Sequence, residues 1–469
     1  MANVSKKDES FRQYALNGAP LRVLFSSCMP LALFQALQSV FKILDAMMAS
    51  HISANAVSAV SALSQITLMI TALGTGLAVA GSIKISEAYG RGDYDTVRKR
   101  VATVYAMAVM VSVVVAAVLI PFASPFLRLL KTPEDLIATG VGYFRVEILT
   151  LVVNFFNTVY IAIERSRGHA KKILNLNLVI VVVKLSLSAY FVYVLHSDVT
   201  MIAVSTLIGQ VLLLGYAIFS MSRDEGAFRF SPRNIFLNRE TAVPVLNLSY
   251  PIAAEKVLFA AGKVIINSMS GLYGGLTVGA LGISNNIGGL TTSWHMGMTD
   301  GAAPLISQNR GAGRHRRCLQ LYFRLIVVNV VIGVVGLAIV SATLPTLAQF
   351  FARSQNKFDQ TFCDMIVSIH KWEMLGYITL GINSATVALL LGYGYTKLTM
   401  LLNVARVFAF RVPVLWFFQQ FTSIGAEAVG MTMMISNVCV GLTAVVVAIP
   451  VVLNIRKTMI QEEREEAQG

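Results

Sequence analysis

Stretches of about twenty apolar residues recur along this chain, and they constrain its fold more than any other feature. A helix of roughly that length crosses the hydrocarbon core of a bilayer, which is about 30 Å thick. Backbone N–H and C=O groups find no water in that core, so each segment must satisfy its own hydrogen bonds, as a helix does. Hydrophobic residues make up 55% of the chain and charged residues only 13%, whereas charged residues are about 25% of a typical soluble domain. The sequence therefore predicts an all-α polytopic membrane protein.

Twelve membrane-spanning helices can be predicted, separated by short polar segments. They cover residues 21–48, 55–87, 98–125, 134–163, 171–195, 200–222, 245–271, 277–303, 318–351, 361–391, 396–421 and 425–455. The longest polar connection divides them into two sets of six. We therefore predict a segment at 1–20, a first lobe at 21–222, a linker at 223–244, a second lobe at 245–455 and a tail at 456–469.

Lys and Arg residues are distributed unequally between the two sides of the predicted membrane region. Twenty-four of them lie before the first span or in the segments that follow the even-numbered spans. The opposite loops hold Arg128, Lys131, Arg353 and Lys357. Because basic loops stay in the cytoplasm, both chain ends are predicted to lie there, in a multi-pass protein of the cytoplasmic membrane. The formal net charge of +14 is then a topology signal, and we expect no nucleic-acid partner.

The two sets of six helices repeat each other. Pro30 and Pro251 lie near the start of their halves and are 221 residues apart. At the same offset, SEAYGRG at 86–92 matches SQNRGAG at 307–313. Repeats of six spans have the same orientation, so an axis along the membrane normal relates them. Two similar bundles that face each other would enclose a central cavity, which is the architecture of transporters that work by alternating access.

Prolines and glycines mark the predicted hinges and helix ends. Pro30 and Pro251 fall inside predicted helices and should bend them. A second group is expected to turn helix ends sharply into the basic loops, because glycine adopts a left-handed backbone without strain: Gly90, Gly92, Gly311 and Gly313.

The first predicted helix carries an acid at membrane depth. Asp45 follows Lys42 by three residues, and a helix places both on one face. An ionised group at this depth faces a bundle interior, a partner or water. Two roles remain open for Asp45: a coupling-ion or proton site in a transporter, or a paired structural acid that fixes helix packing.

Further polar residues fall inside the predicted spans of both halves. We predict that one set lines a substrate cavity: Lys42, Asn154, Lys263, His295, Asp300, Glu373, Tyr377 and Asn383. A histidine can carry a proton near neutral pH. His295 is equally compatible with a hydrogen-bonded packing role.

Three stretches carry a resemblance to a known family. They are PLALFQALQSVFKILD at 30–45, SEAYGRGD at 86–93 and MGMTDGAAPLISQNRGAG at 296–313, which is the most specific of them. In their order and duplication they resemble the MATE (multidrug and toxic compound extrusion) family of the MOP flippase superfamily, over residues 15–455. The resemblance implies two six-helix lobes arranged in a V around a cavity. It also implies a cation-coupled antiporter that exports drugs in exchange for H⁺ or Na⁺.

The resemblance also implies coupling residues, with one departure from the family's pattern. The implied set is Asp45, Asn157, Lys184 and Glu255, with Na⁺ near Asp45 or Glu255 if sodium is the coupling ion. Many prokaryotic members have Asn and Asp where this chain has Lys184 and Ser188. A lysine beside Asp45 would favour the ionised acid and compete with a bound cation.

Several alternatives to drug export remain open. Because the spans hold at least as many basic as acidic residues, organic anions could be the substrates. A lipid-linked oligosaccharide flippase of the same superfamily is a second alternative. A membrane-embedded enzyme would need a convergent nucleophile, metal or acid/base set, which no motif supplies. We expect a monomer in the lipid bilayer that uses H⁺ or Na⁺ as coupling ion, binds a small organic substrate and has no cofactor.

Overall fold

The computed structural model describes residues 4–50, 54–125, 134–197, 200–224, 226–231, 235, 239–354 and 357–468. Within these ranges, the side chains of residues 42–50, 54–66, 134–140, 353–354, 357–358 and 466–468 are outside the description. The predictions that concern the side chains of Lys42 and Asp45 therefore fall outside the described residues.

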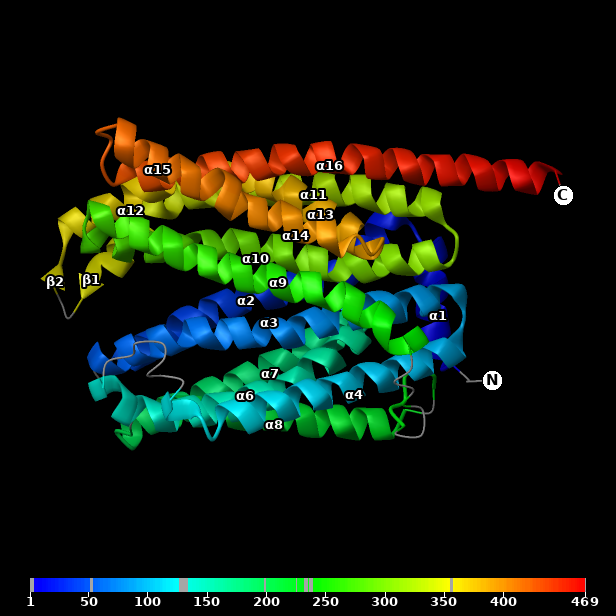
Figure 1. The fold of residues 1–469 in the computed structure, drawn as a ribbon, viewed down its shortest axis with the longest axis horizontal. Helices are drawn as coiled ribbons and strands as arrows, with labels where there is room; N and C mark the ends of the chain where they lie inside the picture. The colour runs from blue at the N-terminus through cyan, green and yellow to red at the C-terminus, as the bar shows by residue number, and fades with distance from the viewer. Residues whose placement is uncertain are drawn as a thin grey trace. The chain divides into compact units, whose positions relative to one another are not determined.

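The regular elements of the first half of the chain are all helices (Figure 1). Its elements are α1 (Lys6–Asn17), α2 (Pro20–Ser50), α3 (Ala54–Arg91), α4 (Tyr94–Leu119), α6 (Glu134–Ser166), α7 (Ala170–Ala189), the π-helix η1 (Tyr190–Val194) and α8 (Thr200–Ser222). Helix α1 lies in the segment before the first predicted span and was not predicted as a helix.

The second half is also helical, apart from a short antiparallel pair formed by β1 (Arg353–Ser354) and β2 (Lys357–Phe358). Its helices are α9 (Arg239–Ser270), η3 (Gly271–Tyr273), α10 (Gly275–Gly311), α11 (His315–Ala352), α12 (Gln360–Glu373), η4 (Met374–Gly376), α13 (Tyr377–Gly392), α14 (Thr396–Ala405), η5 (Arg406–Arg411), α15 (Val412–Phe421) and α16 (Glu427–Gln468). Each of the twelve predicted spans corresponds to one helix, or to two consecutive helices joined by a short 3₁₀ or π turn.

Ten helical stretches of the described chain are long and apolar enough to cross a membrane. Helices α9 and α10, with 32 and 37 residues, are long enough to cross but carry more polar residues. Ser284 and His295 of α10 are buried within the protein. A polar helix of this kind needs protein around it, because lipid cannot satisfy hydrogen-bonding groups.

The chain divides into two compact units, each of which combines most of one half of the chain with part of a helix from the other half. Unit 1 contains residues 1–17 and 40–257, and unit 2 contains residues 18–39 and 258–469. Helix α2 therefore begins in unit 2 and ends in unit 1, whereas α9 begins in unit 1 and ends in unit 2.

Close backbone packing explains why α2 and α9 each begin in one unit and end in the other. In unit 2, a Cβ on Gly297 of α10 would lie only 2.5 Å from the backbone N of Ala32. In unit 1, a Cβ on Gly76 of α3 would lie 2.8 Å from the carbonyl oxygen of Ser249 and 3.1 Å from Ala253 Cβ. Gly76 and Gly297 are 221 residues apart, as are Ala32 and Ala253. Small residues allow helix backbones to approach closely in membranes, so the repeat makes the same contact twice.

Replacing Gly297 by Ala should destabilise unit 2, because the new methyl group would overlap the Ala32 backbone. Overpacking of this kind costs about 1–3 kcal/mol. The check is the midpoint of thermal unfolding in detergent, with Gly282→Ala as matched control, because a Cβ on Gly282 of the same helix meets nothing within 4 Å. A Gly297→Ala protein as stable as Gly282→Ala would contradict the close approach of α2 and α10.

The predicted turn glycines behave in two ways. Gly92 and Gly313 have left-handed backbones, with φ of 78° and 71°; Gly92 directly follows α3, and Gly313 follows the C-cap of α10. Gly90 lies inside α3 and Gly311 is the last residue of α10, and neither has a left-handed backbone. One left-handed residue after the helix end is sufficient to reverse the chain direction.

Helix α1 is anchored to the rest of unit 1 by a buried ion cluster centred on Arg167. The Arg167 guanidinium lies 2.9 Å from Asp8 Oδ2 of α1, 3.4 Å from Glu164 Oε1 and 2.5 Å from Asp224 Oδ2. Phe11 of α1 covers Gly168, where any side chain would overlap its ring. The cluster therefore joins α1 to the ends of α6 and α8.

Candidate functional site

Unit 2 contains a buried chain of hydrogen bonds that ends on a carboxylate. Tyr377 Oη lies 2.9 Å from His370 Nε2, and His370 Nδ1 lies 2.8 Å from Ser284 Oγ. Ser284 Oγ lies 2.5 Å from Glu373 Oε2. His370 and Ser284 are fully buried, and Glu373 is 9% exposed. We call these four residues the carboxylate relay.

When Glu373 is ionised and His370 is neutral, the relay has one consistent set of proton positions. Ser284 donates its hydroxyl proton to the Glu373 carboxylate, which can only accept when ionised. His370 then donates from Nδ1 to Ser284 Oγ, and its Nε2 accepts the proton of Tyr377. With these assignments, each of the three bonds has one donor and one acceptor. The arrangement can pass a proton between the imidazole and the carboxylate through the serine hydroxyl.

A break in the helix places the relay residues. Helix α12 ends at Glu373, one 3₁₀ turn covers Met374–Gly376, and α13 begins at Tyr377. Gly376 faces α16, where a Cβ would lie only 2.6 Å from Asn437 Cβ. Irregular backbone at membrane depth is tolerated where protein surrounds it, and short 3₁₀ segments often mark hinges.

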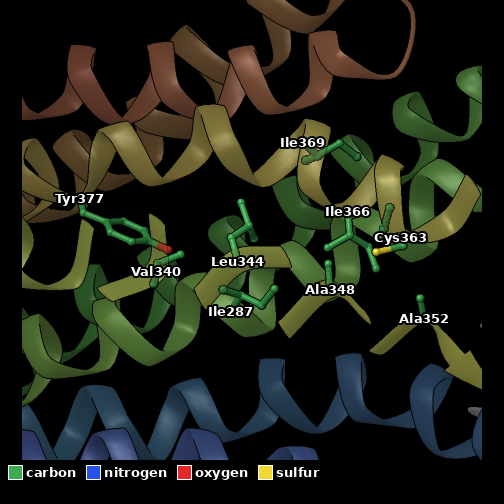
Figure 2. Packing of buried hydrophobic residues seen from close by; sticks show 10 residues of the cluster. Ile287, Val340, Leu344, Ala348, Ala352, Cys363, Ile366, Ile369 and Tyr377 are labelled. Carbon is green, nitrogen blue, oxygen red and sulfur yellow. The ribbon is translucent and has the colours of Figure 1, made fainter. Parts of the chain in front are cut away.

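An apolar cluster packs beside the relay. Figure 2 shows side chains from α10, α11, α12 and α13 that form one cluster, with Tyr377, which also belongs to the relay, at one end of it. Its fully or nearly fully buried members include Ile287, Leu344, Ile366 and Ile369. Ile366 and Ile369 lie four residues before His370 and Glu373, so core and relay side chains are neighbours on the same face of α12.

Glu373 also lies within electrostatic reach of two buried cations. Its carboxylate interacts electrostatically with the guanidinium groups of Arg406 and Arg411, both in η5. The carboxylate is therefore surrounded by an imidazole, a hydroxyl and guanidinium charge. A proton or a cation that neutralised Glu373 would change the balance of charge in this interior.

The other described residues of the predicted substrate cavity have separate partners. Among the members of that set whose side chains the structure describes, only Glu373 and Tyr377 belong to the relay. His295 Nδ1 lies 3.3 Å from Asn329 Oδ1, Gln35 donates to Asp300 Oδ2 at 3.0 Å, and Asn383 donates to Asn403 Oδ1 at 3.5 Å. Lys263 lies over the Phe259 ring, 5.5 Å from its centroid, and Asn154 accepts a bond from Thr158 through its backbone oxygen.

The predicted coupling residues that the structure describes lie in unit 1. Asn157 is fully buried and donates from Nδ2 to the backbone and side-chain oxygens of Gln210, both at 2.8 Å. Lys184 packs against α8 near Gly209, and Glu255 of α9 is 7% exposed. Among the described side chains, no group of three or more His, Cys, Asp or Glu could hold a metal ion.

Sequence reasoning did not single out His370 or Ser284. The spacing of His370 and Glu373, three residues apart on one helix, is the one local signal that could have indicated their pairing. Ser284 is 86 positions before His370. Only the packing of α10 on α12 brings these two side chains together.

Solved structures with the same fold cover almost the whole chain. A multidrug resistance MATE family transporter of the MOP superfamily, in an outward-facing conformation, matches with a TM-score of 0.91 at 17% identity, over 97% of this chain and 100% of that one. A MOP superfamily transporter from Pyrococcus furiosus matches with a TM-score of 0.90 at 18% identity, over 97% and 99%. The fold is therefore the twelve-helix fold of MATE transporters.

Sequence relatives and a family model agree with the fold. The chain is 21% identical to the probable multidrug resistance protein YoeA of Bacillus subtilis, over 84% of this chain and 86% of that protein. It is 20% identical to the multidrug export protein MepA of Staphylococcus haemolyticus, over 74% and 76%. The MatE family model matches twice, at residues 30–190 and 251–417, which together make up more than half of the chain. The chain therefore belongs to the MatE family of membrane transporters.

Proposed function

We propose that this protein is an antiporter that exports drugs or other small organic compounds in exchange for H⁺ or Na⁺. Its MatE membership supports transport, and the relatives named for multidrug resistance and multidrug export support drugs as substrates. The bias of basic residues supports a cytoplasmic-membrane location with both chain ends inside. We further propose that the transporter works as a monomer and needs no cofactor.

The carboxylate relay is the observation that best supports coupling of transport to an ion. Glu373 is buried, its carboxylate is bonded to Ser284, and the helix is interrupted immediately after it at Met374–Gly376. Neutralising this carboxylate by a proton or cation would remove charge next to the interruption. A ligand shifts a conformational equilibrium only through its different affinity for the two states. In this proposal that difference is the charge on Glu373.

The two shared helices are the proposed hinges for alternating access. Helices α2 and α9 are the ones that pass from one compact unit to the other. Pro30 and Pro251 lie inside them, each before the point where the helix changes unit. Proline removes a backbone hydrogen bond from a helix and permits bending there.

Unit 1 offers a second place for coupling. Asp45→Asn should reduce transport at least about tenfold, equivalent to about 1.4 kcal/mol, if Asp45 binds the coupling ion. Lys184→Asn should change which ion gradient drives transport, because a neighbouring cation competes with a bound one. The check is transport in proteoliposomes, with the exposed Asp95→Asn of α4 as control. If both variants match the parent, Asp45 is structural and coupling belongs to unit 2.

The function is tested by efflux from proteoliposomes that contain the purified full chain. A panel of cationic and anionic dyes is loaded, and proton and sodium gradients are applied separately. We expect at least one dye to move against its gradient under one of the two ions. No response of any dye to either gradient would contradict the antiporter proposal.

A further inference from the structure

Two arginines of unit 2 are held on one side of a π-helix. Arg406 and Arg411 are the first and last residues of η5, a π-helix between α14 and α15. A π-helix has i→i+5 bonding, so residues five apart come to the same side, and such segments are frequent at functional sites. Arg411 is 4% exposed, and Arg406 is partly buried.

Both guanidinium groups donate to the same neutral side chain. Asn437 Oδ1 accepts from Arg406 Nε at 3.1 Å, from Arg406 Nη2 at 2.7 Å and from Arg411 Nη2 at 3.4 Å. Arg411 Nε donates to Ser436 Oγ at 3.2 Å. Among the described residues, neither guanidinium forms an ion pair, and neither Nη1 has an acceptor. Like charges are thus brought together around an uncharged oxygen.

A third cation and an aromatic ring adjoin the pair. The Phe259 ring has the Arg406 guanidinium carbon 5.7 Å from its centroid and Lys263 Nζ 5.5 Å from it. Lys263 is exposed on α9. Asn437 itself keeps an unused donor, because its Nδ2 atom is buried with no partner among the described residues.

Glu373 does not neutralise both guanidinium groups. It is one carboxylate within electrostatic reach of two arginines, and its Oε2 atom is already bonded to Ser284 and lies 3.7 Å from His370 Nδ1. Burying an unpaired charge is costly, so clusters of buried cations are normally compensated by an anion. A guanidinium presents a planar fork of N–H donors that matches the two oxygens of a carboxylate or phosphate.

We propose that Arg406, Arg411 and Lys263 form a binding site for the carboxylate or phosphate group of a small organic anion. The apolar body of that anion lies against Phe259. The inference names a substrate class for the antiporter and in that respect rests on the proposed function. Binding itself is independent of any gradient and can be measured without transport.

The test is calorimetric titration of the purified full chain in detergent with four probes that share a phenyl ring. Benzoate and phenyl phosphate carry the oxyanion, benzamide is neutral and benzylamine is cationic. We expect an oxyanion probe to bind at least about tenfold more tightly than benzamide, a difference of about 1.4 kcal/mol. Tightest binding of benzylamine, or equal binding of all four, would overturn the proposal.

The variants locate the site. Arg406→Gln should weaken oxyanion binding at least about tenfold, and Lys263→Gln severalfold, because each removes a cation near the Phe259 ring. Arg456→Gln is the matched control, since Arg456 lies exposed on α16, the helix that carries Asn437. If Arg406→Gln does not fold, Lys263→Gln decides. Equal binding by the folded variants and the control would overturn the proposal.

The two proposals fail in different ways. A protein that binds benzoate through Arg406 but moves no dye under either gradient keeps the anion site and loses the antiporter function. A protein that exports cationic dyes but binds benzoate no better than benzamide keeps the antiporter function and loses the anion site.

Discussion

Replacing Glu373 by Gln is expected to abolish ion-driven transport while leaving the protein folded. Gln has the same shape and can still accept a hydrogen bond from Ser284, so packing in unit 2 is preserved. It cannot be neutralised by a proton, and it attracts a cation far less than a carboxylate does. We expect the gradient-driven efflux rate to fall at least about tenfold. Efflux from proteoliposomes under each gradient is the measurement.

The control for this variant is Glu462→Gln, because Glu462 is 45% exposed near the end of α16. Ser284→Ala is an informative companion, since it interrupts the relay between His370 and Glu373 but keeps the carboxylate. It should impair transport driven by protons more than transport driven by sodium. Unchanged efflux and unchanged ion dependence in Glu373→Gln would remove Glu373 from the coupling mechanism.

Replacing Arg167 by Met should be the most destabilising single substitution that we propose. Asp8 and Glu164 are each 1% exposed, and both depend on the Arg167 guanidinium, as does Asp224. Removing one partner of a buried ion pair costs about 3–5 kcal/mol, because the remaining charges stay buried without compensation. We expect a lower midpoint of thermal unfolding in detergent and faster hydrogen exchange in α1.

Arg91→Met is the matched control for this effect. Arg91 is 45% exposed and lies 3.8 Å from Glu87, and an exposed pair of this kind contributes about 0–1 kcal/mol. Equal midpoints for Arg167→Met and Arg91→Met would show that the Arg167 cluster does not anchor α1. His169 and Lys172 also contact Glu164, at 2.7 and 3.2 Å, and these contacts remain in Arg167→Met. The loss of the guanidinium should therefore destabilise the buried Asp8 carboxylate more than that of Glu164.

The attachment of α1 should weaken in acid and remain constant around neutral pH. Burial would raise the pKa of Glu9, but bonds from Tyr94 and Gln13 and the charge of Arg12 outweigh it and lower that pKa. The contribution of Glu9 is therefore complete above the ordinary value of about 4.3 and is lost as the pH falls through the lowered pKa.

Arg167 adds no pH dependence near neutrality. Burial would lower its pKa, but the bond to Asp8 and the charges of Glu164, Asp8 and Asp224 outweigh it and raise that pKa. The contribution of Arg167 is therefore lost only at strongly alkaline pH. Protection factors of the α1 amides at several pH values check both expectations. A loss of protection between about pH 6 and 8 would contradict them, because it would mean that His169, which lies 2.7 Å from Glu164 Oε2 and 3.8 Å from Asp8 Oδ1, controls docking.

Part of the candidate site could be predicted from the sequence, and part could not. Glu373 and Tyr377 were predicted because polar residues stand out within apolar spans. Ser284 and His370 could not be joined to them, since they come from α10 and α12 and share no local pattern. The π-helix that aligns Arg406 with Arg411 also has no sequence signature that would reveal it.

The sequence by itself determined where the twelve helices run and where the repeated turns lie. Hydropathy acts on each segment separately, and the left-handed backbone at Gly92 and Gly313 depends only on local sterics. Only the tertiary structure decided that α2 and α9 are each shared between two compact units. That division depends on backbone contacts such as Gly297 with Ala32, which lie far apart in the chain and leave no periodic trace in it.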